Sequence, residues 1–191
     1  MNLAVILLAA GRSLRYGGDK LEAVVEGRTL LERALDIVQG LKATQRVAVV
    51  STAQRAETAR RLGVQPVMNP RPDAGIARSV QLGLDACAGA DAYLFMVCDQ
   101  PYLQQRSVER LVGAYAAGEC SIACLGRGNE PGNPVIFDAR YLPELYALTG
   151  DAGGKRVVRA HPQALCIVQA QARELWDLDV PTQEGRPSCK G

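Results

Sequence analysis

Apolar residues are arranged in two different patterns along the chain. Short apolar runs, typical of buried strands, are separated by longer stretches in which apolar residues recur every three or four positions, as in amphipathic helices. We predict strands at residues 3–8, 46–51, 64–68, 92–97, 121–125, 134–137, 165–168 and 175–178. Helices are predicted at residues 30–41, 54–62, 76–88, 106–117, 142–148 and 154–160.

This alternation of strands and helices predicts one α/β domain. Thr29 and Glu32 have the spacing of a capping box, which places a helix start at residue 30. Residues 92–97 are so apolar that both faces of that strand must be covered, as in the centre of a parallel sheet. We therefore expect a single-domain, Rossmann-like fold of three layers, α/β/α, around a mostly parallel, mixed sheet. The domain is expected to span residues 1–184, followed by a disordered tail at 185–191.

Bulk composition restricts the class of protein. A length of 191 residues suits one domain with a sizeable core, and a net charge of +2 is too small for a general nucleic-acid binder. The six cysteines form no C-x-x-C pair and the single histidine, His161, has no cysteine nearby, which argues against a zinc site. No segment has the length of a membrane span and no signal peptide is evident. We expect a cytoplasmic protein that binds neither nucleic acid nor membrane.

The first strand leads into the most informative motif. Residues 7–20 read LLAAGRSLRYGGDK, so an apolar run breaks into a glycine-containing loop that carries Arg12, Arg15 and Lys20. Such loops present backbone N–H groups and positive charge to phosphates. The motif fits neither the P-loop, because no hydroxyl residue follows Lys20, nor the G-x-G-x-x-G dinucleotide pattern. It predicts a third kind of phosphate loop; the alternative is an ordinary strand-to-helix turn with solvated charges.

Carboxylates follow two other predicted strands. Asp99 comes directly after the apolar strand at 92–97, at the sheet edge where the residue 7–20 loop also lies. A carboxylate there suits Mg²⁺, which binds one or two carboxylates together with phosphate oxygens and water. Asp177 lies in the strand predicted at 175–178 and Asp179 comes directly after it, so the two are expected to face one side, where either could complete the metal's ligands. A turn or helix-capping aspartate, and a solvated edge strand, are the respective alternatives.

The opening motif matches L-A-[AG]-G-x-S-x-R-x-G-x-x-K, and the match continues at residues 69–70, 75–84, 98–101, 132–137, 150–153 and 177–181. In these segments the chain resembles the nucleotidyltransferases of the molybdenum cofactor guanylyl- and cytidylyltransferase family. The P-G-x-P-V-x-F segment at 131–137, the G-D-x-G segment at 150–153 and Ala10 are similar to the cytidylyltransferase branch. The resemblance implies a fold of the nucleotide-diphospho-sugar-transferase type.

The resemblance also implies roles for individual residues. Lys20, Arg15 and Asp99 are the expected catalytic residues. The expected nucleotide-binding residues are Leu8, Ala9, Ala10, Gly11, Arg12, Lys20, Asn69, Gly75 and Ser79. Asp99, Asp179 and Asp177, in that order, are the expected Mg²⁺ ligands. Asn133, which stands where the family frequently has histidine, and Asp151 would border the acceptor.

The expected reaction is Mg²⁺-dependent transfer of CMP from CTP to the terminal phosphate of molybdopterin, with release of pyrophosphate. A molybdenum hydroxylase or its maturation factor is the expected protein partner. Three alternatives remain open: GTP in place of CTP, a sugar phosphate or another small phosphate as acceptor, and a non-catalytic maturation protein that binds the cofactor.

Overall fold

A computed structural model describes residues 1–11 and 19–178 of the chain. Seven of its strands form one mixed sheet in the order β5-β4-β1-β6-β8-β7-β9. These strands are β1 (Leu3–Ala9), β4 (Gln45–Val50), β5 (Gln65–Met68), β6 (Ala92–Val97), β7 (Ile122–Arg127), β8 (Glu130–Asp138) and β9 (Leu165–Gln169). Only β8 runs antiparallel to its neighbours, β6 and β7, so the predicted mostly parallel, mixed sheet is confirmed. The tail expected at 185–191 lies outside the described residues.

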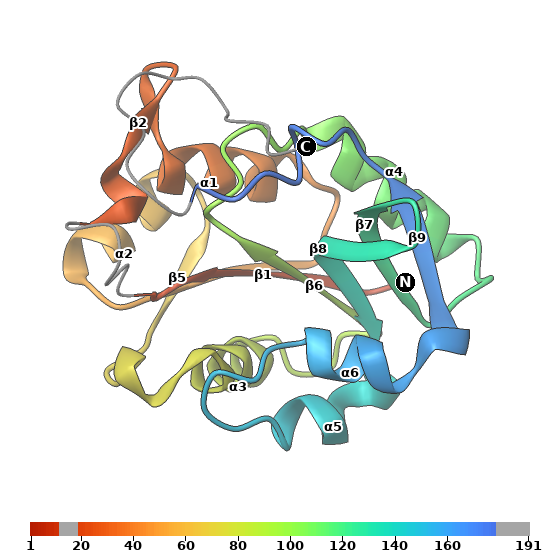
Figure 1. Cartoon of the computed structure of the whole chain (residues 1–191). Coiled ribbons are helices and arrows are strands. Elements are labelled where there is room, and N and C mark those ends of the chain that lie inside the picture. Colours follow the sequence, from red (N-terminus) through yellow and green to blue (C-terminus); the bar gives the residue numbers. More distant parts are fainter. Residues whose placement is uncertain (12–18, 179–191) are drawn as a thin grey trace.

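Helices cover both faces of this sheet (Figure 1). On one face lie α1 (Leu30–Gly40), α2 (Ala53–Arg61) and α4 (Gln105–Ala116), and on the other α3 (Ile76–Ala86), α5 (Leu142–Tyr146) and α6 (Lys155–Ala160). The predicted capping box is present at the start of α1, where Thr29 and Glu32 exchange hydrogen bonds of 3.2 and 3.1 Å. The three-layer α/β/α fold is thereby confirmed.

The core explains why the central strands are apolar throughout. In β1, Leu3, Val5 and Leu7 pack under α1 and α2, whereas Ala4 and Ile6 pack against α3. A strand buried on both faces has no solvent-facing side, so its sequence shows a continuous apolar run rather than alternation. Because β1, β4 and β6 are parallel, their carboxyl ends meet at one edge of the sheet.

The strand predicted at 175–178 is wrong. Residues 172–175 form a turn and 176–178 pair with no strand. Leu175 packs against the core, the Trp176 ring stacks on Tyr102, and the Leu178 N–H donates to the Asp99 carbonyl. The apolar residues of this segment are therefore buried against the core and a loop, and not by a place in the sheet.

Short elements between β1 and α1 were not predicted from sequence. A 3₁₀ turn, η1 (Lys20–Glu22), is followed by a two-stranded hairpin, β2 (Val24–Val25) and β3 (Arg28–Thr29). Two-residue strands are too short to show a hydrophobic period. The hairpin brings the chain from the carboxyl edge of the sheet to the start of α1.

Candidate active site at the carboxyl edge of the sheet

Lys20 and Asp99 form an ion pair at the carboxyl edge. The Lys20 Nζ lies 3.3 Å from the Asp99 Oδ2, and the two side chains are 11% and 32% exposed. Asp99 is the second residue after β6. Lys20 is the first residue of η1, which Asp19 caps by accepting a hydrogen bond from the Leu21 N–H. Residues 79 positions apart therefore meet because β1 and β6 are parallel neighbours.

Asp99 has a second oxygen that suits a metal ion. Its Oδ1 is buried, and none of the described residues donates a hydrogen bond to it. A buried carboxylate oxygen without a donor is costly unless it meets a cation. The donor set, one carboxylate oxygen beside the lysine that is predicted to bind phosphate, therefore fits a hard divalent cation such as Mg²⁺.

Asp177 is brought to Asp99 by a backbone contact. The Leu178 N–H donates a 2.8 Å hydrogen bond to the Asp99 carbonyl, so the residue before Leu178 lies beside the end of β6. Within residues 1–11 and 19–178, no three His, Cys, Asp or Glu side chains gather closely enough to hold a metal. Asp179, Arg12 and Arg15 lie outside the described residues. We call Lys20, Asp99 and Asp177 the charged edge.

The residues at the end of β1 are small and closely packed. Ala9 and Ala10 are buried, with exposures of 1% and 3%, whereas Gly11 is exposed. No described atom lies within 4 Å of the position that a Gly11 Cβ would take. The described residues therefore leave space open beside the Gly11 backbone.

Asn69 and Ser79 bind each other. The Asn69 Nδ2 donates to the Ser79 Oγ at 3.0 Å, the Asn69 Oδ1 accepts from the Arg71 N–H at 2.9 Å, and Asn69 is fully buried. The pair thus holds the loop between β5 and α3 in place. Direct contact of either side chain with a nucleotide stays a prediction.

Gly75 packs against a distant loop. Its φ of 89° lies in the left-handed region, and a Cβ there would collide with the carbonyl group of Gly150. The Gly150 carbonyl also accepts a 3.1 Å hydrogen bond from the Ala77 N–H in the first turn of α3. Gly75 therefore allows the 150–153 loop to reach the start of α3, and its contact with a nucleotide stays a prediction.

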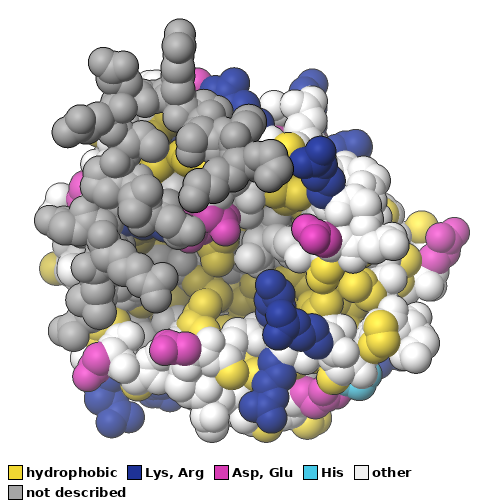
Figure 2. Space-filling view, viewed as in Figure 1, with side chains coloured by type: hydrophobic (Ala, Val, Ile, Leu, Met, Phe, Trp, Pro, Cys, Tyr) yellow, Lys and Arg dark blue, Asp and Glu magenta, His cyan; other side chains and the backbone are white. Residues whose placement is uncertain are grey.

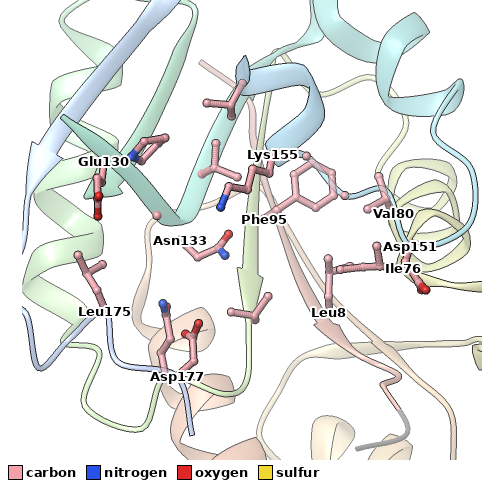
Figure 3. A pocket seen from close by; sticks show the side chains of 18 of the residues that line it. Leu8, Ile76, Val80, Phe95, Glu130, Asn133, Asp151, Lys155, Leu175 and Asp177 are labelled. Carbon is pink, nitrogen blue, oxygen red and sulfur yellow. The ribbon is translucent and has the colours of Figure 1, made fainter. Parts of the chain in front are cut away.

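A cavity of about 460 Å³ opens beside the charged edge. Predicted site residues from four parts of the chain line it: Leu8, Asn133, Asp151 and Asp177. Its apolar lining includes Ile76, Val80, Phe95, Val135 and Val158 (Figure 3). Figure 2 shows this hydrophobic hollow with Lys and Arg side chains at its border. We call it the β8 cavity, because Asn133 and Val135 belong to β8.

Sequence reasoning missed four polar residues of the β8 cavity: Arg127 at the end of β7, Glu130 at the start of β8, Lys155 and Gln100. Lys155, the first residue of α6, extends its ammonium group towards Asn133 (Figure 3). Gln100 lines the cavity as well, and its buried Oε1 accepts no hydrogen bond from the described residues. Gln100 lies next to Asp99 in the sequence and could have been included with it. Nothing in the local pattern around Lys155 distinguishes it from an exposed helical lysine.

Two other reactive side chains do not take part in the site chemistry. Burial raises the pKa of the Cys98 thiol above its ordinary value, and the neighbouring Asp99 raises it further, against opposing effects of Arg55 and Lys20. The thiol is therefore protonated and inert. His161 lies outside the cavity lining, where its Nε2 is 2.8 Å from the Glu144 carboxylate and its ring packs on Tyr141.

Comparison with known proteins identifies the family. The model of the MobA-like NTP transferase domain matches residues 5–165. The chain belongs to this family. The predicted nucleotidyltransferase class is thereby confirmed.

Individual relatives are distant. The chain is 27% identical over 169 residues to the molybdenum cofactor guanylyltransferase of Rhodobacter capsulatus, covering 87% of this chain and 84% of that protein. It is 26% identical over 192 residues to the purine catabolism protein PucB of Bacillus subtilis, covering 93% and 92%. These relatives do not decide between CTP and GTP as the nucleotide of this chain.

Solved structures confirm the expected nucleotide-diphospho-sugar-transferase type of fold. Rv0371c from Mycobacterium tuberculosis superposes with a TM-score of 0.79 at 22% identity, covering 94% of both chains. The same protein in complex with manganese superposes with a TM-score of 0.71 at 21% identity, covering 89% of both. Within the described part of this chain, no helix is both long and apolar enough to cross a membrane.

Proposed function

We propose that the protein transfers CMP from CTP to the terminal phosphate of a molybdopterin-type acceptor and releases pyrophosphate. The observation that carries this proposal is the Lys20–Asp99 pair at the carboxyl edge, which borders a mostly apolar cavity. A cation beside a carboxylate with an unpaired oxygen suits a nucleoside triphosphate with its metal ion. A largely apolar cavity next to it suits a flat ring that carries a phosphate.

The chemistry requires charge neutralisation and alignment more than a strong base. An oxygen of the acceptor's phosphate attacks the α-phosphorus of the nucleotide, and the bond to the β-phosphate oxygen breaks, so pyrophosphate leaves. A phosphate monoester is already ionised and nucleophilic at neutral pH, which agrees with the inert Cys98 and the remote His161. The catalyst must hold two anions together and stabilise the charge on the leaving pyrophosphate.

Lys20 is proposed to bind the triphosphate and to stabilise the leaving pyrophosphate, together with Arg15. Asp99 would hold Mg²⁺ through its unpaired Oδ1, with Asp179 or Asp177 as a second carboxylate ligand. The ion, when bound, supplies positive charge that neutralises the phosphate oxygens. The backbone at residues 8–11 is proposed to contact the nucleotide, with Arg12 at its phosphates.

The acceptor is proposed to bind in the β8 cavity. Phe95 and Val135 offer apolar surface to a ring, and the unpaired Gln100 Oε1 offers an acceptor for a ring N–H. Lys155 and Asn133 would orient the polar end of the molecule, with Asp151 nearby in the lining. A molybdenum hydroxylase or its maturation factor would then receive the product.

A second candidate function is guanylyl transfer to the same acceptor. It is favoured by the R. capsulatus relative, which is named a guanylyltransferase. The two candidates differ only in the base of the nucleotide. Ala10, which is similar to the cytidylyltransferase branch, favours cytosine.

The decisive experiment measures pyrophosphate release with CTP, GTP, ATP and UTP, each with and without molybdopterin and Mg²⁺. We expect release only with acceptor and metal, and fastest with CTP. Faster release with GTP would establish the guanylyl candidate instead. Release with sugar phosphates but not with molybdopterin would reassign the acceptor. Molybdopterin binding without any release would reduce the protein to a cofactor-binding maturation factor.

A further inference from the structure

A buried arginine behind the charged edge makes contacts that neither the motif nor the cavity accounts for. Arg55 lies in the first turns of α2, and its side chain is only 5% exposed. Its Nη1 donates to the Ala9 carbonyl at 2.8 Å, to the Ser51 Oγ at 3.1 Å and to the Gly11 carbonyl at 3.3 Å. Its Nη2 donates to the Asp19 Oδ1 at 2.6 Å.

These contacts join two points of the chain on either side of residues 12–18. Ala9 and Gly11 precede that segment and Asp19 follows it, so one guanidinium holds both of its ends. The group is planar and rigid, and its two terminal nitrogens serve different partners at the same time. The arginine itself is well anchored, because α2 starts directly after β4 and the Thr52 hydroxyl accepts a 3.2 Å hydrogen bond from the Arg55 N–H.

The contacts continue from Asp19 to the charged edge. The Asp19 oxygen that accepts from Arg55 also accepts a 3.1 Å hydrogen bond from the Leu21 N–H and thereby caps η1. Lys20 is the first residue of η1 and reaches Asp99. The orientation of Lys20 therefore depends on where Arg55 holds Asp19.

We infer that Arg55 is a positioning residue, which holds the two ends of the phosphate loop and sets Lys20 opposite Asp99 through Asp19. Apart from Ser51 at its own helix start, the described partners of the Arg55 guanidinium all belong to residues 9–19. Its role in turnover rests on the proposed function, whereas its effect on the position of η1 does not.

The test compares Arg55→Lys with Arg60→Lys, which changes an exposed arginine of the same helix that pairs with Glu57. A lysine ammonium keeps the charge but lacks the two-nitrogen fork. We expect Arg55→Lys to raise the KM for the nucleoside triphosphate by about 10- to 100-fold, the size of effect that small misplacements have, with a smaller change in the KM for the acceptor. Arg60→Lys is expected to match the wild type.

Amide hydrogen exchange gives a second readout that needs no turnover. Exchange of the Leu21 amide, which donates to Asp19, should accelerate in Arg55→Lys, while amides of β1 stay protected. Arg55→Ala, where it folds, should regain part of its activity when guanidinium ion is added well below denaturing concentrations.

The outcomes separate the two proposals. A lower melting temperature with unchanged KM values and unchanged Leu21 exchange would reduce Arg55 to a structural ion pair and overturn the inference. If the wild type releases no pyrophosphate with any nucleotide, the proposed function fails, and Leu21 exchange alone decides whether Arg55 positions η1. Accelerated Leu21 exchange would then support that role.

Discussion

The charged edge and the β8 cavity are built by different means, although they adjoin. The charged edge lies where parallel strands β1 and β6 end. Lys20 binds Asp99 within it, and Arg55 binds Asp19 behind it. The β8 cavity lies where the one antiparallel strand, β8, enters the sheet, and its lining is largely apolar. In the proposed function, the charged edge neutralises the charge of the phosphates, and the β8 cavity selects the acceptor by its shape.

The largest expected effect comes from a substitution in the charged edge alone. Lys20→Ala should raise the activation barrier by about 3–4 kcal/mol, a fall in kcat of roughly 10²- to 10³-fold, because a pre-positioned cation at the leaving group is lost. Steady-state pyrophosphate release measures it. Lys42→Ala, an exposed lysine outside both regions, is the matched control. Turnover of Lys20→Ala at the wild-type rate would remove Lys20 from the chemistry.

Asp99→Asn should act on the metal at the same edge. The amide keeps the shape but loses the negative charge that the unpaired Oδ1 presents, so kcat should fall by about 100-fold and more Mg²⁺ should be needed for half-activation. A Mg²⁺ titration of pyrophosphate release measures both. An unaltered half-activating concentration would mean that the ion is held elsewhere.

Gly75→Ala should disturb one side of the β8 cavity and leave the charged edge intact. Gly75 starts α3 and contacts the 150–153 loop, which lines the β8 cavity. A side chain at its positive φ should lower the free energy of unfolding by about 1–3 kcal/mol. Chemical denaturation measures the loss, and Gly113→Ala, within α4 and with no atom within 4 Å of the added Cβ, is the control. Equal stability of the two variants would contradict the close packing.

Lys155→Ala should give the smallest effect, and it tests most directly whether nucleotide and acceptor bind in separate regions. The lysine is exposed at the cavity mouth, so its attraction to an anionic acceptor is screened and worth about 1 kcal/mol or less. We expect the KM for the acceptor to rise up to about fivefold with the KM for the nucleotide unchanged. If the KM for the nucleotide rises instead, the nucleotide and the acceptor do not bind in separate regions as proposed.

The same contrast explains how far sequence reasoning reached. The strand ends of the charged edge were predicted because β1 and β6 are continuous apolar runs that stop sharply at polar residues. Asp99 follows from that pattern. The β8 cavity combines β8, the 150–153 loop and α6, which are distant in sequence, and only the resemblance indicated Asn133 and Asp151.

Arg55 and residues 175–178 both show what the hydrophobic period of a segment cannot predict. The helix that contains Arg55 was predicted with nearly correct bounds, but an arginine in a polar helix shows no sign that it is buried against another loop. Residues 175–178 look like a short apolar strand, yet Leu175 packs against the core and Trp176 stacks on Tyr102. Periodicity reports which side chains are buried and not which surface buries them.

The sequence by itself determined the three-layer α/β fold, the phosphate-loop motif and the carboxylate at the end of β6. These depend on local order: hydrophobic period, caps and residues at strand ends. Only the tertiary structure decided which polar groups meet, as in Lys20 with Asp99, Arg55 with Asp19 and Asn69 with Ser79. Such pairs depend on strand order and helix placement, which bring together residues between 10 and 79 positions apart.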